Sequence, residues 1–287
     1  MTILEVKNVS FGYSHSTPFE IKALDNVSFS VEKGELIGII GHTGSGKSTL
    51  IQMLNSLLKP EKGQVLLYGK DINTDKATVK EARSRIGLCF QYPEYQLFEE
   101  TCAKDIAFGP KNMGLSEKEI KERVLKAADI VGLDRALLNK SPFDLSGGQK
   151  RRCAIAGVMA MLPEVLILDE PTAGLDPGGR KEIFEMIENY RKSTGATVML
   201  VSHSMEDIAR LADRVLVMNK GRAELFGTVK EVFSDHERLI GMGLNVPVAT
   251  SVISRLREMG LSIEGDVFTI EDAARVLSDF YGRRQGK

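Results

Sequence analysis

The feature that most constrains this chain is a glycine-rich segment that directly follows a short apolar run. Residues 35–40 (Glu-Leu-Ile-Gly-Ile-Ile) lead into Gly41-His-Thr-Gly-Ser-Gly-Lys-Ser48, a full match to G-x-x-x-x-G-K-S. Such a run is typical of a central parallel strand covered on both faces. We expect a helix from about Ser48 to Leu58, which Lys59-Pro60 ends. Glycines let backbone N–H groups point at anionic oxygens, so the segment predicts a phosphate-binding loop.

Residue types in this loop suit the parts of a nucleotide. Lys47 would reach the β- and γ-phosphates, and Ser48 would give Mg²⁺ an oxygen ligand. We expect the whole loop to bind nucleotide: Gly41, His42, Thr43, Gly44, Ser45, Gly46, Lys47, Ser48 and Thr49. The His42 side chain itself is expected to have no chemical role. Kinases, GTPases, helicases and transport ATPases stay open, although Arg222 replaces the Asp of a guanine-reading N-K-x-D.

Two carboxylates follow a second buried apolar run. Val165-Leu-Ile-Leu168 is read as a strand, and Asp169 and Glu170 come directly after it. The strand would place both at the carboxyl edge of the sheet, where open α/β folds bind ligands. Asp169 is expected to hold Mg²⁺ through water. Glu170 is expected to accept a proton from the attacking water, a role worth ~10²–10⁴ in rate.

The order of the elements predicts an α/β fold. Strand patterns at 27–31, 64–68, 85–90, 165–168, 197–201 and 214–218 alternate with helical ones, which favours a mostly parallel sheet flanked by helices. The earliest strands would form an N-terminal antiparallel β subdomain. Residues from about 93 to 162 read as a helical subdomain, in which Ser116 and Glu119 form a capping box.

The tail after residue 228 differs from the rest and is expected to be a small helical domain, 229–287, beside a main domain of 1–228. Two short amphipathic helices are expected there, and they should need the main domain or another subunit to pack on. Pro247 opens the first, with Val248, Val252, Leu256 and Met259 on one face, and Gly260 ends it. Thr269 caps the second, with Ala273, Leu277, Phe280 and Tyr281 aligned.

Composition excludes several classes of protein. The 38 Lys and Arg nearly cancel the 39 Asp and Glu, so the net charge of −1 gives no reason to expect a nucleic-acid partner. Three cysteines are too few and too scattered for a disulfide framework, which favours a reducing compartment. No run approaches the ~18 apolar residues of a membrane span, and the first residues lack a signal-peptide pattern. We expect an intracellular, soluble protein whose membrane role, if any, comes through a partner.

The segment Leu145-Ser146-Gly147-Gly148-Gln149 gives the chain its resemblance to the ABC-type ATPases. Independently of that, Ser146 can cap a helix, and the two glycines expose backbone N–H groups to a phosphate. The resemblance implies that Ser146, Gly147, Gly148 and Gln149 act in trans, on the γ-phosphate of ATP bound by a second subunit. The working unit would then be a dimer, with ATP and Mg²⁺ as cofactors.

The same resemblance implies roles for further residues. Tyr13 would stack on adenine, and Asp176 lies in a segment that resembles the loop linking the two sites of the dimer. Gln91 would touch Mg²⁺ and the attacking water and sense the transport partner, and His203 would contact the γ-phosphate. The implied catalytic set is Glu170, His203 and Gln91. The implied metal set is Ser48, Gln91 and Asp169.

Within this family the chain is most similar to the ATP-binding A component, second type, of energy-coupling-factor transporters. The segments Phe90–Phe98, Asp105–Pro110 and Asp144–Arg152 carry that likeness, and the tail would be a dimerisation domain. The span from Ser48 to Leu145 leaves no room for the long coiled coil of chromosome or DNA-repair relatives. The chain departs from the pattern at Ser56, where Gly is expected, and at Cys102 and Cys153.

That likeness implies partners and a place in the cell. They are a second A subunit, identical or paralogous, a transmembrane T component, and a membrane-embedded S component that binds a vitamin or metal ion. The chain would lie peripherally on the cytoplasmic face of the cell membrane. The alternatives are an ATPase of another ABC importer class and a regulatory ABC ATPase without transport.

Overall fold

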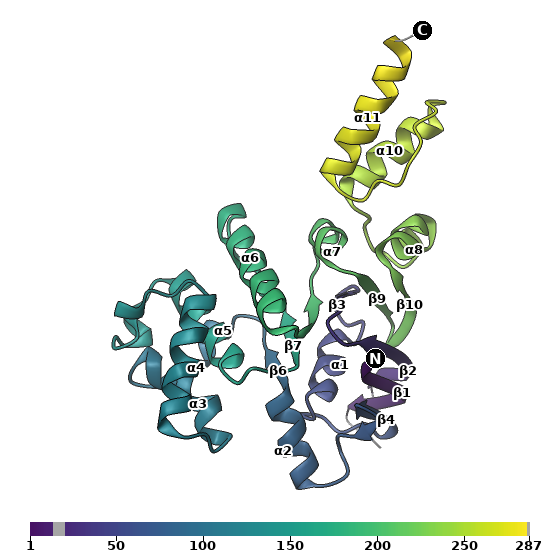
Figure 1. Ribbon diagram of the computed structural model, residues 1–287. Coiled ribbons are helices and arrows are strands. Elements are labelled where there is room, and N and C mark those ends of the chain that lie inside the picture. Colours follow the sequence, from purple (N-terminus) through teal and green to yellow (C-terminus); the bar gives the residue numbers. More distant parts are fainter. Residues whose placement is uncertain (14–20, 286–287) are drawn as a thin grey trace.

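The computed structural model describes residues 1–13 and 21–285, and its centre is a six-stranded sheet (Figure 1). In spatial order the strands are β10 (Arg222–Thr228), β9 (Arg214–Asn219), β3 (Leu36–Ile40), β8 (Thr197–Val201), β7 (Val165–Asp169) and β6 (Ile86–Cys89). The last five are parallel, and β10 pairs antiparallel with β9. Strands β3, β7 and β8 are buried along their whole length, as their continuous apolar runs predict.

Alternate residues of this sheet face two different hydrophobic cores. On β3, Ile37 and Ile39 pack with helix α1 (Lys47–Leu54) and the N-terminal strands. Leu36 and Ile40 face the opposite way, into a core shared with helix α6 (Pro177–Thr194) and helix α7 (Met205–Leu211). The sheet therefore separates the N-terminal part of the chain from the helices on its other side.

The N-terminal part is a second, antiparallel sheet, as predicted. Its strands, in spatial order, are β2 (Ile21–Glu32), β1 (Thr2–Tyr13), β4 (Lys62–Leu67) and β5 (Lys70–Asp71). Tyr13 pairs with Ile21 at the far end of the β1–β2 ladder. Helix α2 (Lys76–Arg85) then leads to β6.

The stretch from 93 to 162 is helical, as predicted, and forms a group beside the sheet (Figure 1). Its α-helices and 3₁₀ helices are η1 (Pro93–Gln96), α3 (Cys102–Asn112), α4 (Glu117–Ile130), η2 (Arg135–Leu137), η3 (Pro142–Asp144) and α5 (Gly147–Met159). The capping box of Ser116 and Glu119 is present at the start of α4. The subdomain's own boundaries stay a prediction.

Helix α1 ends earlier than the expected Leu58. Its last helical residue is Leu54, Asn55 is the C-cap, and Ser56 has a φ of 56°, in the left-handed region. A side chain with a Cβ is disfavoured there, which is the physical reason that glycine suits this position. The chain after Leu54 therefore turns away before the Lys59-Pro60 stop signal is reached.

The C-terminal segment continues from the main body through short helices and then projects away from it (Figure 1). Its helices are α8 (Val229–Ser234), α9 (His236–Gly241), α10 (Val248–Glu258) and α11 (Ile270–Gln285). Within the described residues, 1–13 and 21–285, none of the helices combines the length and apolarity that crossing a bilayer requires.

The structure corrects one expectation about this segment. Helices α10 and α11 share a small core around Ala249, Ile253, Ile263, Val267 and Val276, and Phe268 between them packs against the main core. The expected packing on another subunit stays a prediction. Of the face predicted for α10, Leu256 packs against that core, whereas Val248 and Met259 are 64% and 71% exposed. On α11, the predicted Ala273, Leu277 and Phe280 do pack against it. Ala249 and Ile253 repeat with helical spacing too, so two faces of α10 fit the pattern, and the connection to α11 selects the second.

Candidate functional site

The loop between β3 and α1 needs glycine at two points for steric reasons. Gly41 has a φ of 156°, and a Cβ built on it would lie 2.4 Å from the carbonyl oxygen of Met218. Gly46 has a φ of 101°, and its added Cβ would lie 2.6 Å from the carbonyl oxygen of Ala23. Bare backbone is thus packed against β9 and β2, and the loop's shape is fixed by its neighbours.

Lys47 is held over this loop by the loop itself. Its Nζ donates to the carbonyl oxygens of Gly41, at 2.7 Å, and His42, at 3.0 Å. Burial lowers the pKa of Lys47, while the charges of Glu170 and Asp169 act in the opposite direction. In the His42 side chain, Nε2 lies 3.0 Å from Oδ1 of Asn219 and Nδ1 lies 2.8 Å from the carbonyl oxygen of Thr43.

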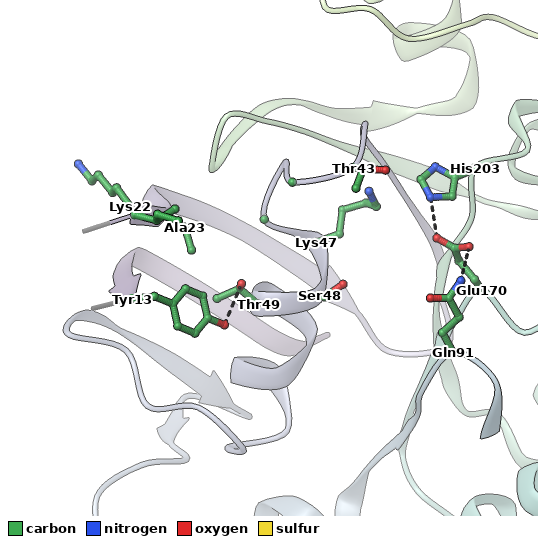
Figure 2. Close-up of a pocket in the computed structure, with 13 residues that line it drawn as sticks. Tyr13, Lys22, Ala23, Thr43, Lys47, Ser48, Thr49, Gln91, Glu170 and His203 are labelled. Carbon is green, nitrogen blue, oxygen red and sulfur yellow. Dashed lines mark hydrogen bonds and ion pairs between the residues drawn. The ribbon is translucent and has the colours of Figure 1, made fainter. Parts of the chain in front are cut away.

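Three polar side chains from neighbouring strands meet at the carboxyl edge of the sheet. Gln91, Glu170 and His203 each follow one of the adjacent parallel strands β6, β7 and β8. Gln91 Nε2 donates to Glu170 Oε2 at 3.1 Å, and His203 Nε2 lies 2.6 Å from Glu170 Oε1 (Figure 2). Adjacent parallel strands end side by side, which is why residues far apart in the sequence converge here.

Asp169, the last residue of β7 and the residue before Glu170, is buried. Burial, reinforced by the charge of Glu170, raises its pKa to about 6, although Lys47 and His203 partly oppose the shift. Its neighbour Glu170 has a φ of 47°, a left-handed conformation in which its N–H donates to the carbonyl of Val201 at 3.1 Å. The turn directs the two successive carboxylates differently, one inward and one toward the open edge.

Tyr13, at the end of β1, lies across a cavity from Gln91, Glu170 and His203 (Figure 2). Its hydroxyl lies 3.3 Å from Oγ1 of Thr49, and its ring meets Phe11 edge-on with 5.0 Å between ring centroids. This cavity has a volume of about 420 Å³. The residues that line it are Tyr13, Ile21, Lys22, Ala23, Thr43, Gly44, Gly46, Lys47, Ser48, Thr49, Gln91, Glu170 and His203.

Ile21, Lys22 and Ala23 were not among the residues that sequence reasoning selected. They belong to β2 and reach the cavity because Tyr13 pairs with Ile21. That register is a property of the folded hairpin and leaves no motif in the sequence. Their strand character, by contrast, continues the alternation that the sequence shows further along at 27–31.

The chemistry of the lining suits a magnesium nucleotide. The loop backbone and Lys47 offer donors to phosphate, and the exposed hydroxyl of Ser48 sits in the first turn of α1. The amide of Gln91 and the carboxylate of Glu170 add oxygen donors of the kind that Mg²⁺ prefers. An aromatic ring at the far end completes a site for a base, a triphosphate and a hard cation.

The residues expected to act in trans lie elsewhere. Ser146 caps α5 through a reciprocal capping box with Gln149, and a Cβ added to Gly147 or Gly148 would meet nothing within 4 Å. None of these four residues lines the cavity. Asp176 is also exposed and caps α6, accepting from the N–H of Gly179 at 2.7 Å. Within one chain, therefore, these groups lie apart from the cavity.

One buried ion pair near the site was missed by the sequence analysis. Arg151 of α5 contacts Glu94 of η1 through two parallel hydrogen bonds, from Nε at 3.0 Å and from Nη2 at 2.7 Å. Its Nη1 donates to the carbonyl of Ala173 at 2.6 Å. A sequence cannot tell which of three consecutive basic residues on a helix turns inward; only Arg151 of Lys150-Arg151-Arg152 is buried.

Comparisons with known proteins place this geometry in context. The family model described as "ABC transporter" matches residues 24–173. A curated relative from Caldanaerobacter subterraneus subsp. tengcongensis, named energy-coupling factor transporter ATP-binding protein EcfA2, is 57% identical over 270 residues, covering 94% of each chain. A relative of the same name from Clostridium tetani is 53% identical over 282 residues, covering 98% of each chain.

Solved structures give the same picture. The structure of cbiO1 from Clostridium perfringens, described as part of the ABC transporter complex cbiONQ, matches with a TM-score of 0.75 and 39% identity, over 90% of this chain and 97% of that one. A dimeric, post-hydrolysis ATP-binding cassette, MJ0796, bound to ADP and Pi, matches with a TM-score of 0.71 and 29% identity, over 79% of this chain and 99% of that one.

Proposed function

The chain belongs to the energy-coupling factor transporter ATP-binding proteins of the ABC transporter family, and on that premise we propose how its residues bind and hydrolyse ATP to energise an importer. The observation that carries the mechanism is the convergence of Gln91, Glu170 and His203 at the phosphate end of a cavity. Loop and aromatic ring supply the rest of the nucleotide's contacts. The family fixes the activity, and this cluster suggests which groups perform it.

ATP would lie with its base on Tyr13 and its phosphates on the loop 41–49. Lys47 would exchange its two loop carbonyls for the β- and γ-phosphates, which makes its present hydrogen bonds a pre-organised resting position. Mg²⁺, when bound, would neutralise phosphate charge, and the residues to hold it are Ser48, Gln91 and, through water, Asp169.

Hydrolysis would use the cluster at the sheet edge. Glu170 would accept a proton from the attacking water on the carboxylate that now faces Gln91 and His203. His203 would orient that carboxylate and donate to the γ-phosphate. Gln91 would release Glu170 and turn toward the water and the metal when nucleotide enters.

The second half of each site would come from another A subunit, identical or paralogous. The exposed N–H groups of Gly147 and Gly148, with Ser146 and Gln149, would close over the partner's γ-phosphate, and Asp176 would lie near the boundary of the two sites. Support comes from their separation from the chain's own cavity. We also propose that 1–228 is the ATPase domain and 229–287 a dimerisation domain, whose apolar Val248 and Met259 stand exposed.

The membrane partners are proposed from the chain's resemblance to the ATP-binding components of energy-coupling-factor transporters. We propose a transmembrane T component and a membrane-embedded S component that binds a vitamin or metal ion, no nucleic acid, and a peripheral position on the cytoplasmic face of the membrane. The exposed aromatic rings of Phe98 and Phe108, which pack edge-on, would contact the T component. Catalysis coupled to translocation would place the protein among the translocases (EC 7).

The direct test is to purify the tagged chain from detergent-solubilised membranes and identify its companions. A second ATP-binding subunit and two integral membrane proteins are expected, and the reconstituted complex should import cargo only with Mg·ATP. Glu170→Gln should retain ATP and lose turnover. A soluble or lipid-anchored binding protein would indicate another importer class, and soluble companions alone would indicate a regulatory ATPase.

A further inference from the structure

A buried guanidinium that the proposed mechanism leaves without a role lies close to the site. Arg151 is 4% exposed and belongs to α5, the helix that begins with Gly147 and Gly148. Arginine is rarely buried this deeply unless its charge is paired. Its contacts are therefore a specific arrangement, and they join three segments of the chain.

Each of the three segments carries a functional group of the proposed mechanism. Glu94, which receives two hydrogen bonds from Arg151, follows shortly after Gln91 in the chain. Ala173, whose carbonyl receives Nη1, follows shortly after Glu170. Arg151 itself follows Ser146 on the signature helix. One side chain thus links the neighbourhoods of Gln91 and Glu170, which face this chain's cavity, to residues that face a partner.

The electrostatics of the contact keep it charged. Burial alone would raise the pKa of Glu94, but hydrogen bonds and the charge of Arg151 outweigh it, so the pKa lies below its usual value. Two parallel N–H···O bonds also fix the plane of the guanidinium, and the Tyr92 ring lies 5.8 Å from it. The two bonds hold the side chains of Arg151 and Glu94 in one relative orientation, since rotation of either would break a bond.

We propose that Arg151 is a positioning residue that couples the nucleotide-dependent placement of Gln91 and Glu170 to the placement of the signature residues offered to the partner subunit. The inference rests on the proposed function. When Gln91 leaves Glu170 for the metal and water, the segment 92–96 moves, and Arg151 carries that movement into α5. The chain would then present Ser146, Gly147 and Gly148 in the closing orientation only when its own pocket is filled.

Arg151→Lys tests this, because lysine keeps the charge and loses the planar fork. The matched control is Arg152→Lys on the same helix, where Arg152 pairs with Glu182 at the surface and donates to Gly132. For each full-length variant, the Kd of a fluorescent ATP analogue, the kcat and KM of hydrolysis, and ATP-dependent association are measured.

For Arg151→Lys we expect an ATP Kd and KM within about twofold of wild type, and a kcat and a degree of association lowered about tenfold, the size expected when a buried bidentate pair is lost. Arg152→Lys should match wild type in all four. An unchanged kcat would reduce Arg151 to a structural residue, and an equal loss of ATP affinity would place it in the pocket itself. Either result overturns the proposal.

Glu94→Gln keeps the size of the acid and gives a second, independent variant should Arg151→Lys fold poorly. It should show the same split, and the double variant should be no worse than the more impaired single one, because both remove one link. Additive losses would refute the coupling. The failures of the two proposals can be told apart. If the wild-type chain copurifies with no membrane proteins, the proposed transport function is wrong. The ATP-dependent association of the variants tests the role of Arg151 separately.

Discussion

Ser56 occupies a left-handed conformation that costs a residue with a Cβ about 1–2 kcal/mol. Its hydroxyl recovers little, because its contact with the carbonyl of Ile72 is 3.4 Å long. Ser56→Gly should therefore raise the free energy of unfolding by up to about 1 kcal/mol in urea denaturation. Ser56→Ala, which keeps the Cβ and removes the hydroxyl, is the control and should be no more stable than wild type. Equal stability of the two variants would contradict this account.

Asp169 makes the free energy of unfolding of the nucleotide-free protein depend on pH. Because its pKa is raised to about 6 from an ordinary value near 3.8, the folded state holds this proton more tightly than the unfolded state. Its contribution to the unfolding free energy therefore falls as pH rises from about 4 through 6, by roughly 3 kcal/mol in full. Asp169→Asn removes this dependence, so without metal and nucleotide it should be more stable than wild type at pH 7.5.

The measurement is urea denaturation of both proteins with EDTA at a series of pH values. All other titrating groups are shared, so the difference between the two curves isolates residue 169. The difference should be smallest near pH 3.5, should grow through pH 6, and should level off above pH 7. A difference that does not vary with pH would show that the carboxyl of Asp169 is not held protonated in the folded chain.

At the scale of elements, a side chain of α7 caps the start of α10, which has no capping side chain of its own. Helix α10 begins after Pro247 with no side-chain cap, and its first N–H, on Val248, donates to Glu206 Oε1 at 3.1 Å. Glu206→Ala should free this end, a loss of about 1 kcal/mol that speeds local amide exchange around residues 248–251 about fivefold. Glu237→Ala, on the neighbouring α9, is the control and should leave exchange unchanged. Equal amide exchange rates around residues 248–251 in wild type and both variants would show that the contact does not stabilise the start of α10.

The elements also show where sequence reasoning succeeds. Strands β3, β7 and β8 could be predicted because burial on both faces demands continuous apolar runs. Strand β10 was missed since Arg222–Thr228 is only partly buried and carries charges and a glycine. The inner face of α10 was misjudged because two of its faces repeat with helical spacing, and only the partner helix decides between them.

The candidate site divides in the same way. Its loop, its two carboxylates and Gln91 and His203 are tied to strand ends, so motif and strand pattern together locate them. Arg151 has no such marker, because its inward direction depends on Glu94, a residue brought near by tertiary packing. Ile21, Lys22 and Ala23 enter through the pairing of two strands. Contacts that depend on long-range packing cannot be predicted from a single sequence.

For the whole molecule, the claim that two chains complete each other's sites can be tested by complementation. Lys47→Ala should disable the pocket of its own chain, and Ser146→Arg the signature offered to the neighbour. Each variant alone should lose ATP hydrolysis. Mixing them assembles pairs with one intact composite site, so part of the activity should return; where the two A subunits are paralogues, the two changes are placed one in each.

Both substitutions combined in one chain are the control: in a mixed pair of that double variant with wild type, each composite site contains one altered half, so no activity should come from the mixed pairs. The readout is ATP turnover against the mole fraction of each protein. Activity that never returns in mixtures of the single variants would mean that one chain builds its whole site alone. The cavity's lining, which includes Lys47 but none of residues 146–149, predicts recovery.

The central sheet with its two separate cores has a mechanical consequence. Helix α1 and the N-terminal strands pack against one face of the sheet, while α5 and α6 pack against the other. A tilt of the helical group therefore deforms only one of the two interfaces. The surface that faces a second subunit can therefore change its angle while the contacts around the proposed nucleotide pocket stay in place.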